Sequence, residues 1–135
     1  MTDNLAKRVL MVEDHVFFSQ AFELVLGRRP SEGPLGSAAF HRAPTVEEGL
    51  RLFSEVGPFV LAIVDLVLPD GDGTEVVREI KASSPETPVA VLSSVEDLSG
   101  ALAAGADEAI RKDTPLPEII ARLERLASGG AKPAT

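Results

Sequence analysis

The sequence contains no cysteine, tryptophan or tyrosine, and it has no long apolar segment. Without cysteine the chain forms no disulfide and no thiolate metal site, which fits a reducing compartment, and we expect a cytoplasmic protein. No stretch approaches the roughly 20 apolar residues of a membrane span, and the polar start of the chain does not resemble a secretory signal. Because six phenylalanines are the only aromatic residues, the core must be mainly aliphatic.

Positive charge is also scarce. The chain carries 13 Lys and Arg residues against 21 Asp and Glu residues, a formal net charge of −8. Because a protein that grips nucleic acid through its phosphates needs a basic surface, this composition argues against direct nucleic-acid binding. We interpret the excess acid mainly as a source of solubility. The 135 residues, 44% of them hydrophobic, are enough for one domain with a real core.

Buried-strand patterns and helical periodicities alternate five times along the chain. The expected strands are residues 7–12, 38–42, 59–64, 89–92 and 108–111. The expected helices are residues 16–26, the segment from Val46 to the break at Gly57-Pro58, 74–82, 96–104 and 115–127. This order predicts a doubly wound α/β fold, with a five-stranded parallel sheet and helices on both faces. Residues 1–128 should form the domain, and 129–135 a flexible tail or a linker remnant.

Polar residues stand where four of these strands end. Glu13 and Asp14 follow the first strand, Asp65 the third, Ser93 the fourth and Lys112 the fifth. The carboxyl ends of parallel strands meet at one edge of a sheet, so these side chains should converge. Three neighbouring carboxylates repel one another and therefore need a cation, and an all-oxygen ligand set favours Mg²⁺.

Such a cluster has the parts that phosphoryl transfer requires. A Mg²⁺ ion on one or two carboxylates neutralises phosphate oxygens, and an aspartate can be the nucleophile that forms an acyl phosphate. Lys112 would supply a fixed positive charge, and the Ser93 hydroxyl a hydrogen bond, to the phosphate oxygens.

The motifs VLMVEDH, LAIVDLVLPDGDG, VAVLSS and GADEAIRKD resemble the receiver domain of two-component response regulators, over about residues 7–128. The resemblance implies that a sensor histidine kinase or a phosphotransfer protein phosphorylates Asp65. It implies a magnesium site and two contacts to the phosphoryl group. The magnesium ligands would be Glu13, Asp14, Asp65 and the backbone carbonyl of Val67, and the phosphoryl contacts Ser93 and Lys112.

Two further features are similar to receivers that precede a LuxR-type helix-turn-helix domain: His15 directly after the acid pair, and Lys112-Asp113. This similarity implies regulation of transcription through an output domain that this sequence lacks. The chain is then either a piece of a longer regulator or a receiver that acts alone.

We interpret His15 as an exposed residue of the first helical turn, and the Asp70-Gly-Asp72-Gly segment as a flexible loop at the mouth of the site.

Two positions depart from the family pattern. Ala109 stands where receivers usually carry a Tyr or Phe that moves on phosphorylation, and the segment before it is about one helical turn short. A switch here would work by something other than an aromatic rotamer, with a homodimer surface on the first and last helices as one possible output.

Two alternatives stay open. One is a phosphorylation-independent module for dimerisation or docking. The other is a Mg²⁺-dependent phosphohydrolase. As a receiver, the chain would catalyse at most its own phosphorylation and slow dephosphorylation.

Overall fold

The computed structural model describes residues 7–30 and 32–129. Its main sheet contains β1 (Arg8–Val12), β2 (Ala39–Ala43), β3 (Leu61–Val64), β6 (Val89–Ser93) and β7 (Glu108–Arg111). The helices are α1 (Val16–Gly27), α2 (Val46–Val56), α3 (Thr74–Ser83), α4 (Ser99–Ala104) and α5 (Leu116–Ala127). The strand order is β2-β1-β3-β6-β7 and every neighbouring pair is parallel. The predicted doubly wound α/β fold is confirmed.

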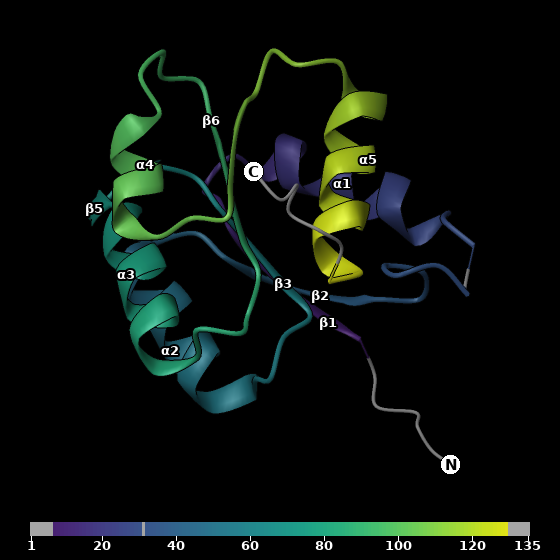
Figure 1. Cartoon of the computed structure of the whole chain (residues 1–135), viewed down its shortest axis with the longest axis horizontal. Helices are drawn as coiled ribbons and strands as arrows, with labels where there is room; N and C mark the ends of the chain where they lie inside the picture. The colour runs from purple at the N-terminus through teal and green to yellow at the C-terminus, as the bar shows by residue number, and fades with distance from the viewer. Residues whose placement is uncertain (1–6, 31, 130–135) are drawn as a thin grey trace.

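The sheet is covered on both faces. Figure 1 shows α1 and α5 on one side of it, and α2, α3 and α4 on the other. The alternation within β1 explains how one strand serves both layers: Leu10 and Val12 belong to the cluster under α2–α4, and Val9 and Met11 to the cluster under α1 and α5. Because both faces are buried, the strand reads as an unbroken apolar run in the sequence.

Several element boundaries differ from the sequence prediction. Strand β3 begins at Leu61, two residues later than expected, yet Phe59 is still only 5% exposed and packs near the Phe53 ring. Helix α4 begins at Ser99 rather than at residue 96. The reason is local: the Asp97 carboxylate accepts hydrogen bonds from the Ser99 backbone N–H and hydroxyl, which forms a turn directly before the helix.

The predicted loop between residues 28 and 37 contains a buried anchor. Leu35 is fully buried and joins the core cluster beneath α1 and α5. Of the predicted tail, only Gly129 lies within the described residues. In the described ranges 7–30 and 32–129, no helix combines the length and the apolar character needed to cross a bilayer.

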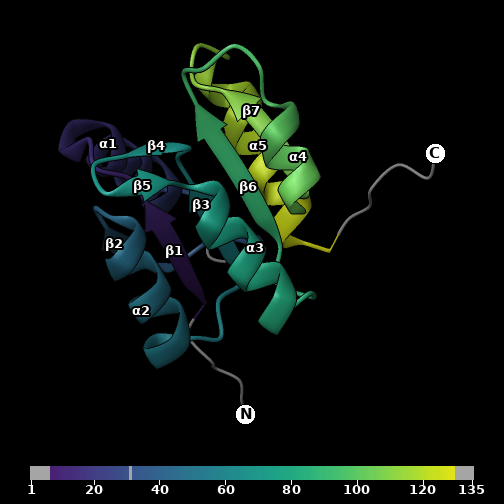
Figure 2. The same ribbon diagram turned by 90° about the vertical axis from the view of Figure 1, so that its left-hand side faces the viewer.

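The segment after Asp65 is a small antiparallel hairpin instead of the flexible loop that we expected. It consists of β4 (Val67–Leu68) and β5 (Gly71–Asp72) and lies beyond the carboxyl end of β1 (Figure 2). The Asp70 carboxylate accepts hydrogen bonds from the backbone N–H groups of Val46 (2.8 Å) and Glu47 (3.1 Å). The hairpin is therefore tied to the N-terminus of α2.

This contact supplements the side-chain cap of α2. The Thr45 hydroxyl accepts a hydrogen bond from the Glu48 backbone N–H, as is usual for a threonine at the N-cap position. Asp70 then satisfies two further N–H groups of the first helical turn, which otherwise lack an acceptor. The hydrogen bond from Val46 is the largest cause that lowers the pKa of Asp70 below its usual value.

Gly73 closes the hairpin against the backbone of the Asp65 segment. Its N–H donates to the Leu66 carbonyl oxygen (2.8 Å). A Cβ atom at this position would overlap the carbonyl oxygen of Asp65, and backbone atoms cannot move aside as a flexible side chain can. The position of Asp65 therefore depends on a residue without a side chain at position 73.

We expect Gly73→Ala to lower the free energy of unfolding by about 1–3 kcal/mol, the usual range for overpacking. Gly100→Ala is the matched control. Gly100 lies in α4 with open space around it and no positive φ, so alanine should stabilise the helix by about 0.5–1 kcal/mol. Urea denaturation of the two variants measures both effects. Equal stability of Gly73→Ala and the wild type would contradict the close approach.

We expect Asp70→Asn to lower the melting temperature at pH 7, because an amide cannot accept from both backbone N–H groups. The pKa of Asp70 is lowered in the fold, so its contribution is present above the unfolded value and is lost as the pH falls through the folded value. The difference from the wild type should therefore shrink between pH 4 and pH 2. The control is Asp72→Asn, since one Asp72 oxygen accepts from Thr74 and an amide oxygen can replace it. A pH-independent difference would contradict this account.

Candidate functional site

Two carboxylates are buried at the carboxyl edge of the sheet. Glu13 follows β1 and is 1% exposed, and Asp65 follows β3 and is 4% exposed. Their backbone N–H groups extend the strand ladder, to the Ala43 and Val12 carbonyl oxygens respectively. Because isolated charges are costly to bury, these two groups need a positive partner.

Lys112 provides that partner. Its ammonium lies 2.9 Å from Glu13 Oε1 and 3.2 Å from Asp65 Oδ2. Burial alone would lower the pKa of Lys112, but the hydrogen bonds and charges of Glu13 and Asp65 outweigh burial and raise it. The ammonium therefore keeps its charge at neutral pH.

Two other contacts position Lys112. The Lys112 backbone N–H donates to the Ser93 carbonyl oxygen (2.9 Å), which ties β7 to the end of β6. The ammonium also lies 4.6 Å from the centroid of the Phe18 ring, within cation–π range. The helical periodicity of residues 16–26 placed Phe18 on α1 but did not predict which residue it contacts. Phe18 lies next to the Lys112 ammonium because α1 packs near the end of β7, and the sequence gives no sign of that contact.

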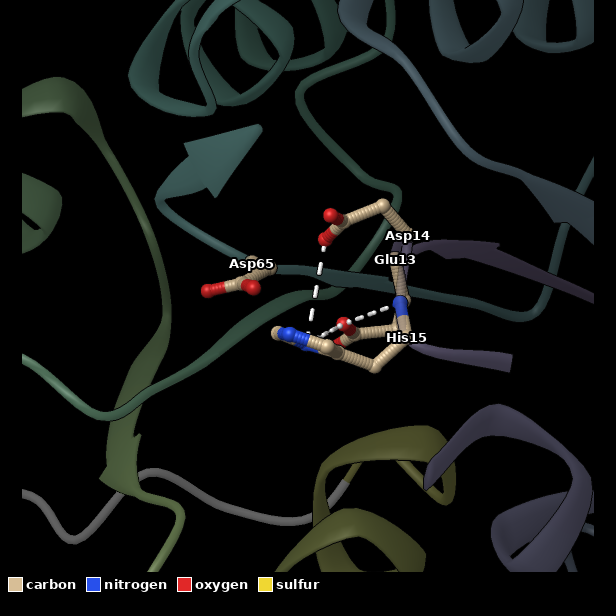
Figure 3. A group of neighbouring side chains, drawn as sticks. All are labelled: Glu13, Asp14, His15 and Asp65. Carbon is tan, nitrogen blue, oxygen red and sulfur yellow. Dashed lines mark hydrogen bonds and ion pairs between the residues drawn. The ribbon is translucent and has the colours of Figure 1, made fainter. Parts of the chain in front are cut away.

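Asp14 and His15 complete the cluster on the solvent side. Figure 3 shows both side chains directed toward the region of Asp65. Asp14 Oδ1 is buried and is without a hydrogen-bond partner in the structure. His15 is the N-cap residue of α1, and its side chain is 68% exposed. Its Nδ1 atom lies 2.9 Å from Glu13 Oε2 and 3.8 Å from Asp14 Oδ1.

This arrangement fits a divalent cation. Glu13, Asp14, His15 and Asp65 each bring a ligand atom to within 4.8 Å of the others. Three carboxylates face a single ammonium, so negative charge remains to be neutralised. The buried Asp14 Oδ1 atom also needs a partner, because buried polar atoms are nearly always satisfied. Mg²⁺ is the cation that a mainly carboxylate site of this kind suits best.

The remaining candidates from the sequence lie beside the cluster. Ser93 is fully buried at the end of β6, and its hydroxyl accepts from the Val95 N–H at 3.4 Å. Val67 opens the hairpin, and its N–H lies 3.4 Å from Asp65 Oδ1. Direct contacts thus join Glu13 and Asp65 to Lys112, and a carboxylate oxygen of Asp14 lies within 4.8 Å of theirs. Ser93 ends β6, and Val67 begins β4. The metal role of the Val67 carbonyl stays a prediction.

Ala109 occupies the middle of β7, opposite Val91 of β6. It is partly buried and packs against the core cluster under α2–α4. The next strand residue toward the N-terminus, Glu108, pairs with Arg122 of α5 at 2.5 Å. β7 thus makes an ion pair toward α5 and, on its other face, presents only a methyl group at position 109, where an aromatic ring is usual in the family that the sequence resembles.

Comparison with known proteins identifies the family. Residues 9–124 match the response regulator receiver domain. The chain belongs to this family, whose members are the receivers of two-component systems. It is 34% identical over 122 residues to the cell cycle response regulator CtrA of Brucella ovis, an alignment that covers 88% of this chain and 49% of the relative. The chain spans less than half the length of the curated relatives that it matches.

Solved structures agree with the fold. A LuxR-family two-component response regulator from Aurantimonas superimposes with a TM-score of 0.78 at 23% identity, covering 93% of this chain and 87% of the other. A response regulator from Burkholderia pseudomallei, solved with a phosphorylated aspartic acid, calcium and citrate, gives a TM-score of 0.74 at 25% identity, covering 91% and 69%. A LuxR-family receiver is thus among the structural neighbours, as the motifs around His15 and Lys112 suggested; at 23% identity that neighbour shows the fold alone.

We expect Lys112→Met to reduce the free energy of unfolding by about 1–3 kcal/mol at pH 7, because it leaves two buried carboxylates without their donor. Lys112→Arg keeps the charge and should recover part of the loss. The raised pKa of Lys112 means that its contribution is present below the usual lysine value and disappears only at higher pH. Denaturant unfolding at pH 7 and pH 9 should therefore give the same difference. A methionine variant more stable than the wild type would refute the ion-pair account.

Proposed function

We propose that this receiver accepts a phosphoryl group on Asp65 in a Mg²⁺-dependent reaction and thereby switches a partner surface. The observation that carries the proposal is the position of Asp65. Its carboxylate is buried at a strand end, one oxygen contacts Lys112, and two further acidic residues lie beside it. A carboxylate held in this way is oriented for attack on phosphorus, and the charge that develops has a fixed counter-ion.

The phosphodonor would be the phosphohistidine of a sensor kinase or of a phosphotransfer protein. An Asp65 oxygen forms a bond to phosphorus while the phosphorus–nitrogen bond breaks. The imidazole leaves with the bonding electron pair, and Asp65 becomes an acyl phosphate. Lys112 is released from its contact with Asp65 Oδ2 to hold a phosphoryl oxygen, and the Ser93 hydroxyl donates to another.

Mg²⁺, when bound, would neutralise the phosphoryl oxygens during transfer. We assign its ligands to Asp14, Asp65 and the Val67 carbonyl, with Glu13 acting through water. The buried and unpartnered Asp14 Oδ1 supports this assignment. The hairpin also supports it, because Asp70 and Gly73 fix the backbone that carries Val67 next to Asp65.

The output would be a change in an interaction surface. Phosphorylation must favour one of two conformations by a few kcal/mol to act as a switch. Exposed apolar residues on α1 and at the start of α5, including Leu24 and Leu116, offer a homodimer surface. We further propose that the chain works in the cytoplasm and that its output is regulation of transcription, the role implied by the resemblance to LuxR-type regulators.

A phosphorylation-independent docking module is the second candidate. Ala109 favours it, because the methyl group cannot perform the rotamer change of a tyrosine or phenylalanine. The complete set of Asp65, Lys112 and Ser93 favours the switch.

Intact mass after incubation with acetyl phosphate and Mg²⁺ tests the proposal. We expect the wild type to gain one phosphate, and Asp65→Asn to gain none. Asp72→Asn, which removes a carboxylate of the neighbouring hairpin, should react like the wild type. Size-exclusion chromatography of the same samples would show whether phosphate changes self-association.

Each other result points to one alternative. A folded wild-type chain that takes up no phosphate from acetyl phosphate or from phosphohistidine donors would indicate the docking module. Release of many equivalents of inorganic phosphate per chain from small phosphate esters would indicate a phosphohydrolase. Phosphorylation of Asp65→Asn would place the acceptor elsewhere.

A further inference from the structure

The imidazole of His15 has no part in the phosphoryl transfer described above, yet it faces the metal centre. The side chain is largely exposed and could point into solvent without cost. Instead its Nδ1 atom lies 2.9 Å from Glu13 Oε2 and 3.8 Å from Asp14 Oδ1, and the His15 backbone N–H donates to the same Glu13 oxygen (3.0 Å). Figure 3 shows the ring beside the Asp14 carboxylate.

We propose that His15 supplies a nitrogen ligand to this centre, which then binds Ni²⁺, Co²⁺ and Zn²⁺ more tightly than Mg²⁺. The inference deepens the proposed function, since it rests on the same metal centre. It differs from the usual all-oxygen set in one respect, the imidazole.

The distances around His15 suit ligands of one ion. Two donor atoms that each lie ~2.1 Å from a metal are ~3.0 Å apart at a right angle and ~4.2 Å apart when opposite. The 3.8 Å separation of Nδ1 from Asp14 Oδ1 lies within that range. It is too long for a hydrogen bond, so without an ion the two atoms do not satisfy each other. The 2.9 Å contact of Nδ1 with Glu13 Oε2 is a hydrogen bond, and Glu13 keeps its role through water.

Asp14 provides a second observation. Its side chain is 31% exposed, but its Oδ1 atom is buried and has no hydrogen-bond donor, although an imidazole nitrogen is its neighbour. An ion shared by Asp14 and His15 would satisfy Oδ1. Binding through Nδ1 requires the tautomer with its proton on Nε2, so the ion would take the place of the proton that Nδ1 otherwise donates to Glu13.

The chemistry of the ligands gives the selectivity. Mg²⁺ prefers oxygen and keeps several of its waters, so an imidazole adds little to its binding. Ni²⁺, Co²⁺ and Zn²⁺ bind imidazole strongly. Among first-row metals, their affinities for a site of nitrogen and oxygen ligands generally exceed those of Mn²⁺ and Fe²⁺. Small amounts of these ions should therefore displace Mg²⁺ from the centre.

Calorimetric titration of the untagged, unphosphorylated chain with NiCl₂ and separately with MgCl₂ tests this inference at one fixed pH. His15→Asn is the informative variant, because asparagine is a favoured N-cap and its amide can still donate to Glu13. We expect Ni²⁺ affinity to fall at least about tenfold in this variant, comparable to the loss of a ligand-supporting contact. Mg²⁺ affinity should stay nearly unchanged.

Two control variants separate the outcomes. His41→Gln removes the other histidine of the chain, which packs near Phe59, and should leave Ni²⁺ binding unchanged. Asp14→Asn should weaken both metals. If Asp14→Asn weakens both metals but His15→Asn leaves Ni²⁺ binding intact, the nitrogen ligand is refuted and the proposed function stands. If Asp14→Asn affects neither metal, the metal centre of the proposed function fails as well.

Discussion

The ammonium of Lys112 between Glu13 and Asp65 is the interaction on which the site depends. A parallel sheet brings the carboxyl ends of β1 and β3 together, and in this chain both ends carry a buried carboxylate. Without a cation these groups would repel each other in a poorly solvated place. The lysine, from the end of β7 two strands away from β3, makes the cluster compatible with a folded domain.

A second constraint holds the backbone around Asp65. The hairpin after β3 is anchored at two points, by Asp70 in its turn on the N-terminus of α2 and by Gly73 at its base against the Asp65 carbonyl. The hairpin therefore links the backbone at Asp65 to α2 and α3 on one face of the sheet. Lys112 couples it to α1 on the other face through Phe18. Both layers of the domain thus contact the residues around Asp65, and none of the contacts named here involves Ala109.

The sequence predicted the strands and helices well, but it predicted the boundaries and connecting segments between them poorly. Unbroken apolar runs located the central strands β1, β3 and β6, and 3.6-residue periodicity located the helices, because both patterns follow from burial. The edge strands β2 (AFHRA) and β7 (EAIR) contain polar residues, and they were expected from the alternation of strand and helix. The errors occur where a hydrogen bond from one side chain sets the local structure. Asp97 binds the Ser99 N–H just before α4, which begins later than expected, and Asp70 binds the N-terminus of α2 and so holds the hairpin where we expected a flexible loop. The sequence does not show which distant backbone N–H groups a carboxylate in a loop will bind.

By itself the sequence determined which polar residues stand at the carboxyl edge of the sheet, since Glu13, Asp14, Asp65, Ser93 and Lys112 each lie at the end of a strand, and parallel strands end at one edge. Only the tertiary structure decided how they meet: which oxygen of Asp65 faces Lys112, that Phe18 lies against the lysine, and that Nδ1 of the largely exposed His15 contacts Glu13. The physical reason is that strand order follows from local patterns of burial. Contacts between side chains depend on packing between segments far apart in the sequence, such as those of Phe18 and Lys112.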